Sequence, residues 1–208
     1  MKTIALVGAS DLNIDHFVLR CAAGAFDAVI AVDGGYASLE AAGCVPDLAL
    51  GDFDSLGYVP EGVPVKDFPP EKDASDMELA LEEALACGAD AVEVYGALGG
   101  RLDHTLANLQ LLASFAERGL EVRAVGADSQ IAFLVGPTEL CVEGEPGALV
   151  SVFSLSDAST GVVEEGLKYS LDHVTLTNRT SWGLSNEFAA APARIAAESG
   201  TLAVFLPL

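Results

Sequence analysis

The chain has 208 residues, of which 51% are hydrophobic, enough for one large domain or two small domains with apolar cores. It holds 31 acidic and 10 basic residues, and the resulting formal charge of −21 argues against a nucleic acid partner. Apolar runs such as 4–9 are far shorter than the roughly 20 residues of a membrane helix, and Asp11 and Asp15 come too early for a signal peptide. We therefore expect a cytoplasmic protein with no membrane partner.

The first two thirds of the chain alternate strand-like and helix-like patterns. Continuous apolar runs, typical of strands buried on both faces of a parallel sheet, occupy 3–9, 27–34, 47–54, 90–97 and 120–127. Helical apolar spacing covers 76–87, and a similar stripe continues after Asp103. This alternation predicts a doubly wound α/β domain over residues 1–126, with a mostly parallel sheet and flanking helices.

From residue 127 onward the pattern changes to short strand-like runs that Gly, Pro, Asn, Asp and Ser separate. These runs are 129–136, 148–155, 161–167, 173–178 and 202–208. Short strands with frequent turn residues are typical of an all-β sandwich or barrel. We predict a small β-sandwich over residues 127–208, with no low-complexity linker before it.

Polar segments in the α/β part follow the ends of predicted strands. They are 33–35, 52–55 and 96–104, and a further segment, 72–76, opens a predicted helix. The ligand crevice of an open α/β sheet lies at the carboxyl ends of its strands. We therefore expect these segments to form one cleft.

Asp52 and Asp54 lie two residues apart at such a strand end. Two carboxylates on one side of a strand repel each other unless a cation lies between them. Mg²⁺ prefers carboxylate oxygens and completes its shell with water and phosphate oxygens. The alternative is that one aspartate caps the turn and the other faces solvent.

Asp76 has two readings at the start of its predicted helix. Ser75 and Glu78 have the spacing of a capping box, in which an acidic first-turn residue favours the helix dipole. Asp76 could instead be a third metal carboxylate beside Asp52 and Asp54.

The segment 96–104 combines three glycines with Arg101 and Asp103. Glycines let the backbone approach a ligand closely, and an arginine fork matches phosphate. Asp103 could also be only the N-cap of the following helix. Neither a P-loop nor a dinucleotide fingerprint is present, so the residues by themselves predict a Mg²⁺-dependent enzyme that acts on a phosphorylated ligand.

A set of motifs, in this order, resembles the thiamine pyrophosphokinase family over most of the chain. They are DGG (33–35), PDLALGDFDSL (46–56), EKDASDMELAL (71–81), GALGGRLDHTLANL (96–109), and GLKYSL (166–171) with GLSNEF (183–188). The resemblance implies an N-terminal α/β domain that binds nucleotide and metal, and a C-terminal β-sandwich for thiamine binding and dimerisation. It also implies a homodimer with Mg²⁺ as cofactor, which transfers pyrophosphate from ATP to the thiamine hydroxyl, giving thiamine diphosphate and AMP.

The resemblance further implies roles for individual residues. The catalytic residues would be Asp52, Asp54, Asp76 and Arg101, the three aspartates holding the metal. The nucleotide site would be lined by Asp33, Gly34, Gly35, Ser75, Arg101 and Asp103. Thiamine would contact Ser185 and Asn186 from the partner subunit's β domain, and Lys72, which stands at a substrate-site position of the family.

Other readings stay open. A phosphohydrolase of the haloacid dehalogenase type also uses an aspartate pair, but Leu56 stands where that pattern has Thr or Val. A non-catalytic nucleotide or metal sensor would keep the fold without turnover. Trp182 could stack on thiamine or be a core or dimer-interface residue.

Overall fold

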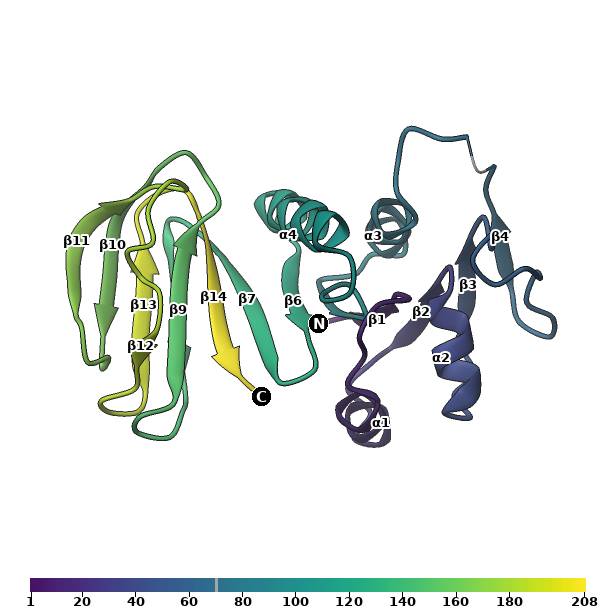
Figure 1. Ribbon diagram of the computed structural model, residues 1–208, viewed down its shortest axis with the longest axis horizontal. Helices are drawn as coiled ribbons and strands as arrows, with labels where there is room; N and C mark the ends of the chain where they lie inside the picture. The colour runs from purple at the N-terminus through teal and green to yellow at the C-terminus, as the bar shows by residue number, and fades with distance from the viewer. Residues whose placement is uncertain (70) are drawn as a thin grey trace. The chain divides into compact units, whose positions relative to one another are not determined.

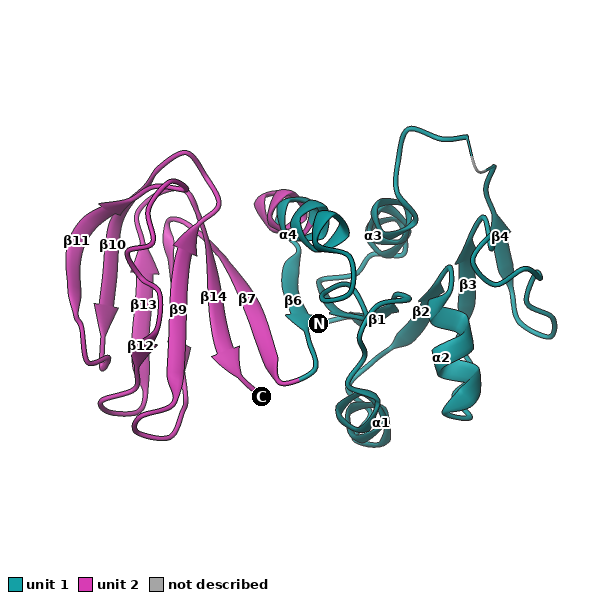
Figure 2. Cartoon of the chain, viewed as in Figure 1, with its two compact units in different colours: residues 1–111, 119–127 teal, residues 112–118, 128–208 magenta. Residues whose placement is uncertain are grey.

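The computed structural model describes residues 1–69 and 71–208 and divides them into two compact units (Figure 2). Unit 1 comprises 1–111 and 119–127, and unit 2 comprises 112–118 and 128–208. Because the helix that spans both ranges, α4 (Leu102–Glu117), ends in unit 2, the division is not a single cut in the sequence.

Unit 1 is built on a parallel sheet with the strand order β6-β5-β1-β2-β3-β4. The strands are β1 (Thr3–Val7), β2 (Ala28–Val32), β3 (Leu48–Gly51), β4 (Val65–Asp67), β5 (Ala91–Tyr95) and β6 (Glu121–Val125). All five residues of β5 and the last four of β1 are buried, as expected for central strands covered on both faces. The predicted parallel α/β fold is confirmed.

Helices cover both faces of this sheet (Figure 1). α1 (Ile14–Ala22) and α2 (Gly35–Ala41) lie on one face, and α3 (Asp76–Ala86) and the first part of α4 lie on the other. Ser75 caps α3 by accepting the Glu78 N–H at 3.2 Å, as the capping box predicts. Asp103 lies inside the first turn of α4, so the alternative that it is the N-cap is wrong.

The chain changes direction across the sheet beside β1. It proceeds from β1 through β2 and β3 to β4, and then returns to place β5 on the other side of β1. Gly8 and Gly96, which follow β1 and β5, run in direct backbone contact, since a Cβ on Gly96 would lie 2.2 Å from the Gly8 carbonyl oxygen. A switch of this kind is where open α/β sheets bind ligands.

Unit 2 is an antiparallel sandwich, which confirms the second predicted fold. The sheet β12-β9-β14-β7 packs against the sheet β11-β10-β13-β8. The strands are β7 (Ser129–Val135), β8 (Thr138–Val142), β9 (Leu149–Ser154), β10 (Ser159–Glu165), β11 (Leu171–Leu176), β12 (Asn186–Glu187), β13 (Ala193–Ala197) and β14 (Thr201–Pro207). Val152 and Val204 from the first sheet share one core with Val162 and Ile195 from the second.

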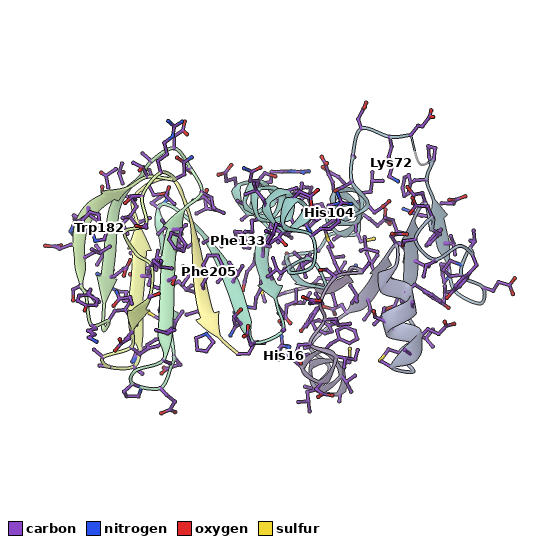
Figure 3. The ribbon with its side chains drawn as sticks, viewed as in Figure 1. His16, Lys72, His104, Phe133, Trp182 and Phe205 are labelled. Atoms are coloured by element: carbon purple, nitrogen blue, oxygen red, sulfur yellow. The ribbon has the colours of Figure 1, made fainter. Side chains whose placement is uncertain are left out.

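The first of these sheets carries an aromatic cluster on the face away from that core. Ala203 pairs with Phe133 on one side and Phe153 on the other, and residues paired in this way point to the same face. Phe205 lies on that face too, with its ring 5.7 Å from the ring of Phe153 in an edge-to-face contact. Figure 3 labels Phe133 and Phe205 on their strands, and all three phenylalanines are half-buried.

Within residues 1–69 and 71–208, the longest helix is α4, and none has the length and apolarity to cross a membrane.

Candidate active site

The turn after β3 places Asp52 and Asp54 on either side of a buried phenylalanine. Phe53 is 3% exposed and takes a positive φ of 55°, so its ring anchors the turn in the core while the backbone changes direction. Asp33, at the end of neighbouring β2, also has a positive φ of 48° and donates its N–H to the Leu50 carbonyl oxygen at 2.8 Å. The two strand ends are therefore held together by the backbone.

Asp33, Asp52 and Asp54 form an acidic cluster there. Each offers one carboxylate oxygen, and these oxygens lie within 4.8 Å of one another. Asp33 Oδ2 accepts a hydrogen bond of 2.6 Å from Ser55 Oγ, whereas Asp33 Oδ1 is buried with no hydrogen-bond partner. Three close carboxylates with an unsatisfied buried oxygen are suited to a hard divalent cation.

Lys72 connects this cluster to Asp76. Its Nζ lies 2.7 Å from Asp52 Oδ2 and 3.0 Å from Asp76 Oδ1. The contact to Asp52 is a hydrogen bond, and the contact to the buried Oδ1 of Asp76 is an ion pair. Lys72 comes from the segment between β4 and α3, where Figure 3 labels it.

Burial and the ion pairs together shift the pKa values of Asp52, Asp76 and Lys72. The hydrogen bond from Lys72 holds the pKa of Asp52 below its usual range, against the effect of burial. Burial raises the pKa of Asp76 although Lys72 opposes this. Burial also disfavours the Lys72 ammonium, but the two carboxylates outweigh it and raise the Lys72 pKa.

Gly34 and Gly35 are required by close packing at the start of α2. A Cβ on Gly35 would lie 1.9 Å from the Val7 carbonyl oxygen, and a Cβ on Gly34 would lie 2.9 Å from both the Ala9 Cβ and Ser55 Oγ. Any larger residue would push α2 away from the end of β1 and displace the turn that carries Ser55.

The glycine-rich loop after β5 is fastened by three polar side chains that the sequence reasoning missed. Ser10 Oγ donates to the Gly99 carbonyl oxygen at 2.9 Å, and Asn108 Nδ2 donates to the Ala97 carbonyl oxygen at 2.8 Å. Thr105 Oγ1 accepts the Gly99 N–H at 3.1 Å. Asn108 and Thr105 lie early in α4, in the predicted motif, but only the fold shows that they turn back onto the loop.

Arg101 and Asp103 form a two-bond ion pair at the end of this loop. Arg101 Nε and Nη2 donate to the two Asp103 oxygens at 3.2 and 2.6 Å. The hydrogen bonds from Arg101 lower the pKa of Asp103 to about 2. Both side chains are exposed, so the guanidinium is accessible to an anionic ligand that displaces Asp103.

In unit 2, Asn186 is buried and its carboxamide is fully engaged. Its Nδ2 donates to Glu164 Oε2 at 3.0 Å and to the Tyr169 carbonyl oxygen at 2.8 Å. Its Oδ1 accepts the N–H groups of Tyr169 and Glu187, each at 3.0 Å. Asn186 therefore ties the GLSNEF motif to the GLKYSL motif, and no donor or acceptor of its amide is left for a ligand.

Ser185, next to Asn186, is exposed with a positive φ of 57°, and its N–H donates to Ser151 Oγ at 3.0 Å. Because Ser151 pairs with Phe205, Ser185 borders the aromatic face of unit 2. Trp182, labelled in Figure 3, is 52% exposed. It is therefore not a core residue of this chain.

Glu164, in unit 2, is a further residue that sequence reasoning missed. Its side chain is fully buried, and Oε1 has no hydrogen-bond partner. Burial raises the pKa of Glu164 to about 7, although the hydrogen bond from Asn186 opposes the shift. A glutamate inside the strand run 161–167 gives no hint in the sequence of which face it occupies.

Comparison with known proteins agrees with these two halves. The family model described as the thiamin pyrophosphokinase catalytic domain matches residues 19–124, and the model described as the thiamin pyrophosphokinase vitamin B1 binding domain matches residues 138–202. The thiamine pyrophosphokinase of Bacillus subtilis (strain 168) is 32% identical over 165 residues, which are 76% of this chain and 77% of that relative. The chain belongs to the thiamine pyrophosphokinase family.

Solved structures of thiamine pyrophosphokinases share the whole fold. The crystal structure of the Bacillus subtilis thiamine pyrophosphokinase superimposes with a TM-score of 0.83 at 28% identity, covering 99% of each chain. A thiamin pyrophosphokinase family protein from Enterococcus faecalis gives the same score and identity, covering 100% of this chain and 99% of its own. The thiamin pyrophosphokinase from Candida albicans shares the fold at 17% identity, with a TM-score of 0.81.

Proposed function

We propose that the chain transfers pyrophosphate from ATP to the hydroxyl group of thiamine, giving thiamine diphosphate and AMP. The observation that carries the proposal is the arrangement of Asp33, Asp52 and Asp54, with Lys72 and Asp76 beside them, at the strand ends of a member of this family. The thiamine hydroxyl loses its proton as its oxygen bonds to the β-phosphorus, and the bond from the β-phosphorus to the bridging oxygen breaks, so that AMP leaves with that oxygen.

The donor set fits Mg²⁺. Asp52, Asp54 and Asp76 would hold the ion, and Asp33 joins this set because its oxygen lies in the same cluster and its Oδ1 has no other partner. Mg²⁺, when bound, would supply the positive charge that the triphosphate needs beside this acidic cluster. The aspartates themselves fix where that charge sits, since Phe53 and the paired strand ends hold their backbone.

The nucleotide would lie along Asp33, Gly34, Gly35 and Ser75, with Arg101 and Asp103 at the loop after β5. Arg101 would exchange the Asp103 carboxylate for phosphate oxygens, which accept the same two-bond geometry. Phosphoryl transfer requires little covalent work from a protein, so positioning and charge are the main contributions of these residues.

For thiamine, we assign the contact to Ser185, acting in the site of the other subunit of a homodimer, and a positioning role to Asn186, whose amide is already saturated. Lys72 would face the substrate from the α/β unit. We also propose a homodimer, and the half-buried phenylalanines beside Ser185 support a surface for a second copy. Sedimentation of the purified protein tests this. We place the enzyme in the cytoplasm, where ATP is available.

The deciding experiment incubates the protein with ATP, Mg²⁺ and thiamine and separates the products by chromatography. We expect AMP and thiamine diphosphate in equal amounts, and neither when thiamine is omitted. Inorganic phosphate released without thiamine would favour the phosphohydrolase. Binding of ATP and thiamine without product, with any divalent metal, would favour the sensor.

A further inference from the structure

The ammonium group of Lys72 lies between the carboxylates of Asp52 and Asp76. Its Nζ lies 2.7 Å from Asp52 Oδ2 and 3.0 Å from Asp76 Oδ1, and its side chain is only 14% exposed. The two carboxylates are 11% and 21% exposed. Water therefore screens these three charges weakly, and each carboxylate depends on the ammonium for compensation.

Asp52 belongs both to the acidic cluster and to the ion pair with Lys72. Its carboxylate belongs to the cluster with Asp33 and Asp54, and the same carboxylate accepts the hydrogen bond from Lys72. Asp76 Oδ1 is buried and lies 3.0 Å from the same ammonium group. An ammonium and a divalent cation that use the same carboxylates must compete for them.

We propose that Lys72 is a built-in counter-cation of the metal-free enzyme, which holds Asp52 and Asp76 together and withdraws from them when a divalent cation binds. The inference rests on the metal assignment of the proposed function and goes beyond it in giving Lys72 a role before any substrate arrives. The alternative is a permanent ion pair in which Lys72 organises the carboxylates for the metal.

These two roles predict opposite changes in metal affinity when Lys72 is replaced. If Lys72 competes, Lys72→Met removes the competitor and leaves an extra uncompensated negative charge, so affinity rises. If Lys72 organises the carboxylates, the same change lets them move apart, and affinity falls.

The experiment measures Mn²⁺ binding to the nucleotide-free protein by the loss of the free-ion electron paramagnetic resonance signal. Mn²⁺ is a suitable probe because carboxylate sites that take Mg²⁺ also take Mn²⁺. We expect Lys72→Met to bind Mn²⁺ more tightly by on the order of tenfold. Lys66→Met is the matched control, because Lys66 is an exposed lysine on β4 that pairs with Glu83. The Lys66→Met protein should bind Mn²⁺ with the affinity of the unchanged protein.

Two further variants keep the result interpretable. Lys72→Gln retains a hydrogen-bond donor without the charge, and it should bind Mn²⁺ more tightly even if Lys72→Met folds poorly. Asp52→Asn combined with either Lys72 variant should abolish the gain, since it removes the shared carboxylate. Unchanged or weaker Mn²⁺ binding in both Lys72 variants, or a gain that survives Asp52→Asn, would overturn the inference.

Thermal unfolding gives an independent readout. Without metal, Lys72→Met should unfold at a lower temperature than the unchanged protein. Saturating Mn²⁺ should raise the unfolding midpoint of Lys72→Met by more than it raises the midpoint of the unchanged protein. Neither measurement uses thiamine or turnover. An inactive protein with this binding pattern would therefore refute only the proposed reaction, and an active protein with unchanged Mn²⁺ affinity would refute only the role of Lys72.

Discussion

Asn186 donates a hydrogen bond of 3.0 Å to Glu164, a carboxyl group that has no exposed surface. Asn186 directly follows the exposed Ser185, so a buried pair supports a residue proposed to contact the substrate. Because a buried carboxyl group titrates abnormally, this support depends on pH.

Stability should fall as pH rises through the range in which Glu164 loses its proton. Its pKa is about 7 when folded against 4.5 for the unfolded chain, so between these values the folded state binds more protons and the free energy of unfolding decreases with pH. The full effect is roughly 3 kcal/mol, complete above pH 7. Chemical denaturation from pH 4.5 to 8 measures it, as the difference between the unchanged protein and Glu164→Gln, which cannot titrate.

Glu165→Gln is the control for this measurement. Glu165 is the next residue, but it is exposed, and its hydrogen bond with Arg194 lowers its pKa. Its removal should leave the decline between pH 4.5 and 7 in place. A decline that persists in Glu164→Gln would assign it to other groups.

Replacing Asn186 by Ala should loosen the two motifs of unit 2. It leaves Glu164 Oε2 and both backbone groups of Tyr169 without their partner, at about 1–3 kcal/mol for each group that stays buried. We expect a lower free energy of unfolding and a higher KM for thiamine with the KM for ATP unchanged. Asn178→Ala, at an exposed asparagine that bonds to Asp157, should change neither. If Asn186→Ala is destabilised but its KM for thiamine is unchanged, the hydrogen bonds of Asn186 have only a structural role.

Asp54→Ala should abolish turnover and leave the fold intact. Asp54 is exposed, and removing one of three close carboxylates relieves repulsion in the metal-free protein. We expect kcat to fall by about a thousandfold or more, as when a transition-state charge loses its stabilisation, with an unfolding midpoint at or above that of the unchanged protein. Glu61→Ala, an exposed acidic residue outside the cluster, controls for net charge. An active Asp54→Ala would end the metal assignment.

Replacing Arg101 and replacing Asp103 should change the KM for ATP in opposite directions. Arg101→Ala and Arg101→Lys should both raise the KM for ATP at least about tenfold, because lysine cannot reproduce the two-bond fork. Asp103→Asn should lower it by up to about fivefold, the value of an exposed ion pair that ATP no longer has to break. Initial rates at saturating thiamine measure this. A raised KM in Asp103→Asn would show that Asp103 itself contacts the nucleotide.

Much of the fold was predictable because its strands are continuous apolar runs. β1, β2, β3, β5 and β6 each lie within a predicted run. β4 escaped because Val65–Asp67 is a short edge strand with exposed Lys66 and Asp67. β13 escaped because three of the five residues of Ala193–Ala197 are alanines and a fourth is an arginine, a weak strand pattern.

The site was predictable where chemistry follows strand ends and unpredictable where it depends on contacts across the fold. The aspartates after β2 and β3 could be foreseen, since parallel strand ends meet. The fastening of the glycine loop by Ser10 joins residues 89 positions apart, and the Glu164–Asn186 bond joins residues 22 positions apart. No local pattern encodes such pairs, because they depend on which side chains face each other after folding.

The Arg101–Asp103 pair also bears on how fast a nucleotide arrives. The exposed guanidinium that would attract an anion is already neutralised by its neighbour, in a chain with a formal charge of −21. An ATP molecule thus approaches against a repulsive field. At this loop it meets no uncompensated positive charge until the Arg101–Asp103 ion pair breaks. Added salt, which slows association when charges attract, should accelerate the encounter here by screening that repulsion.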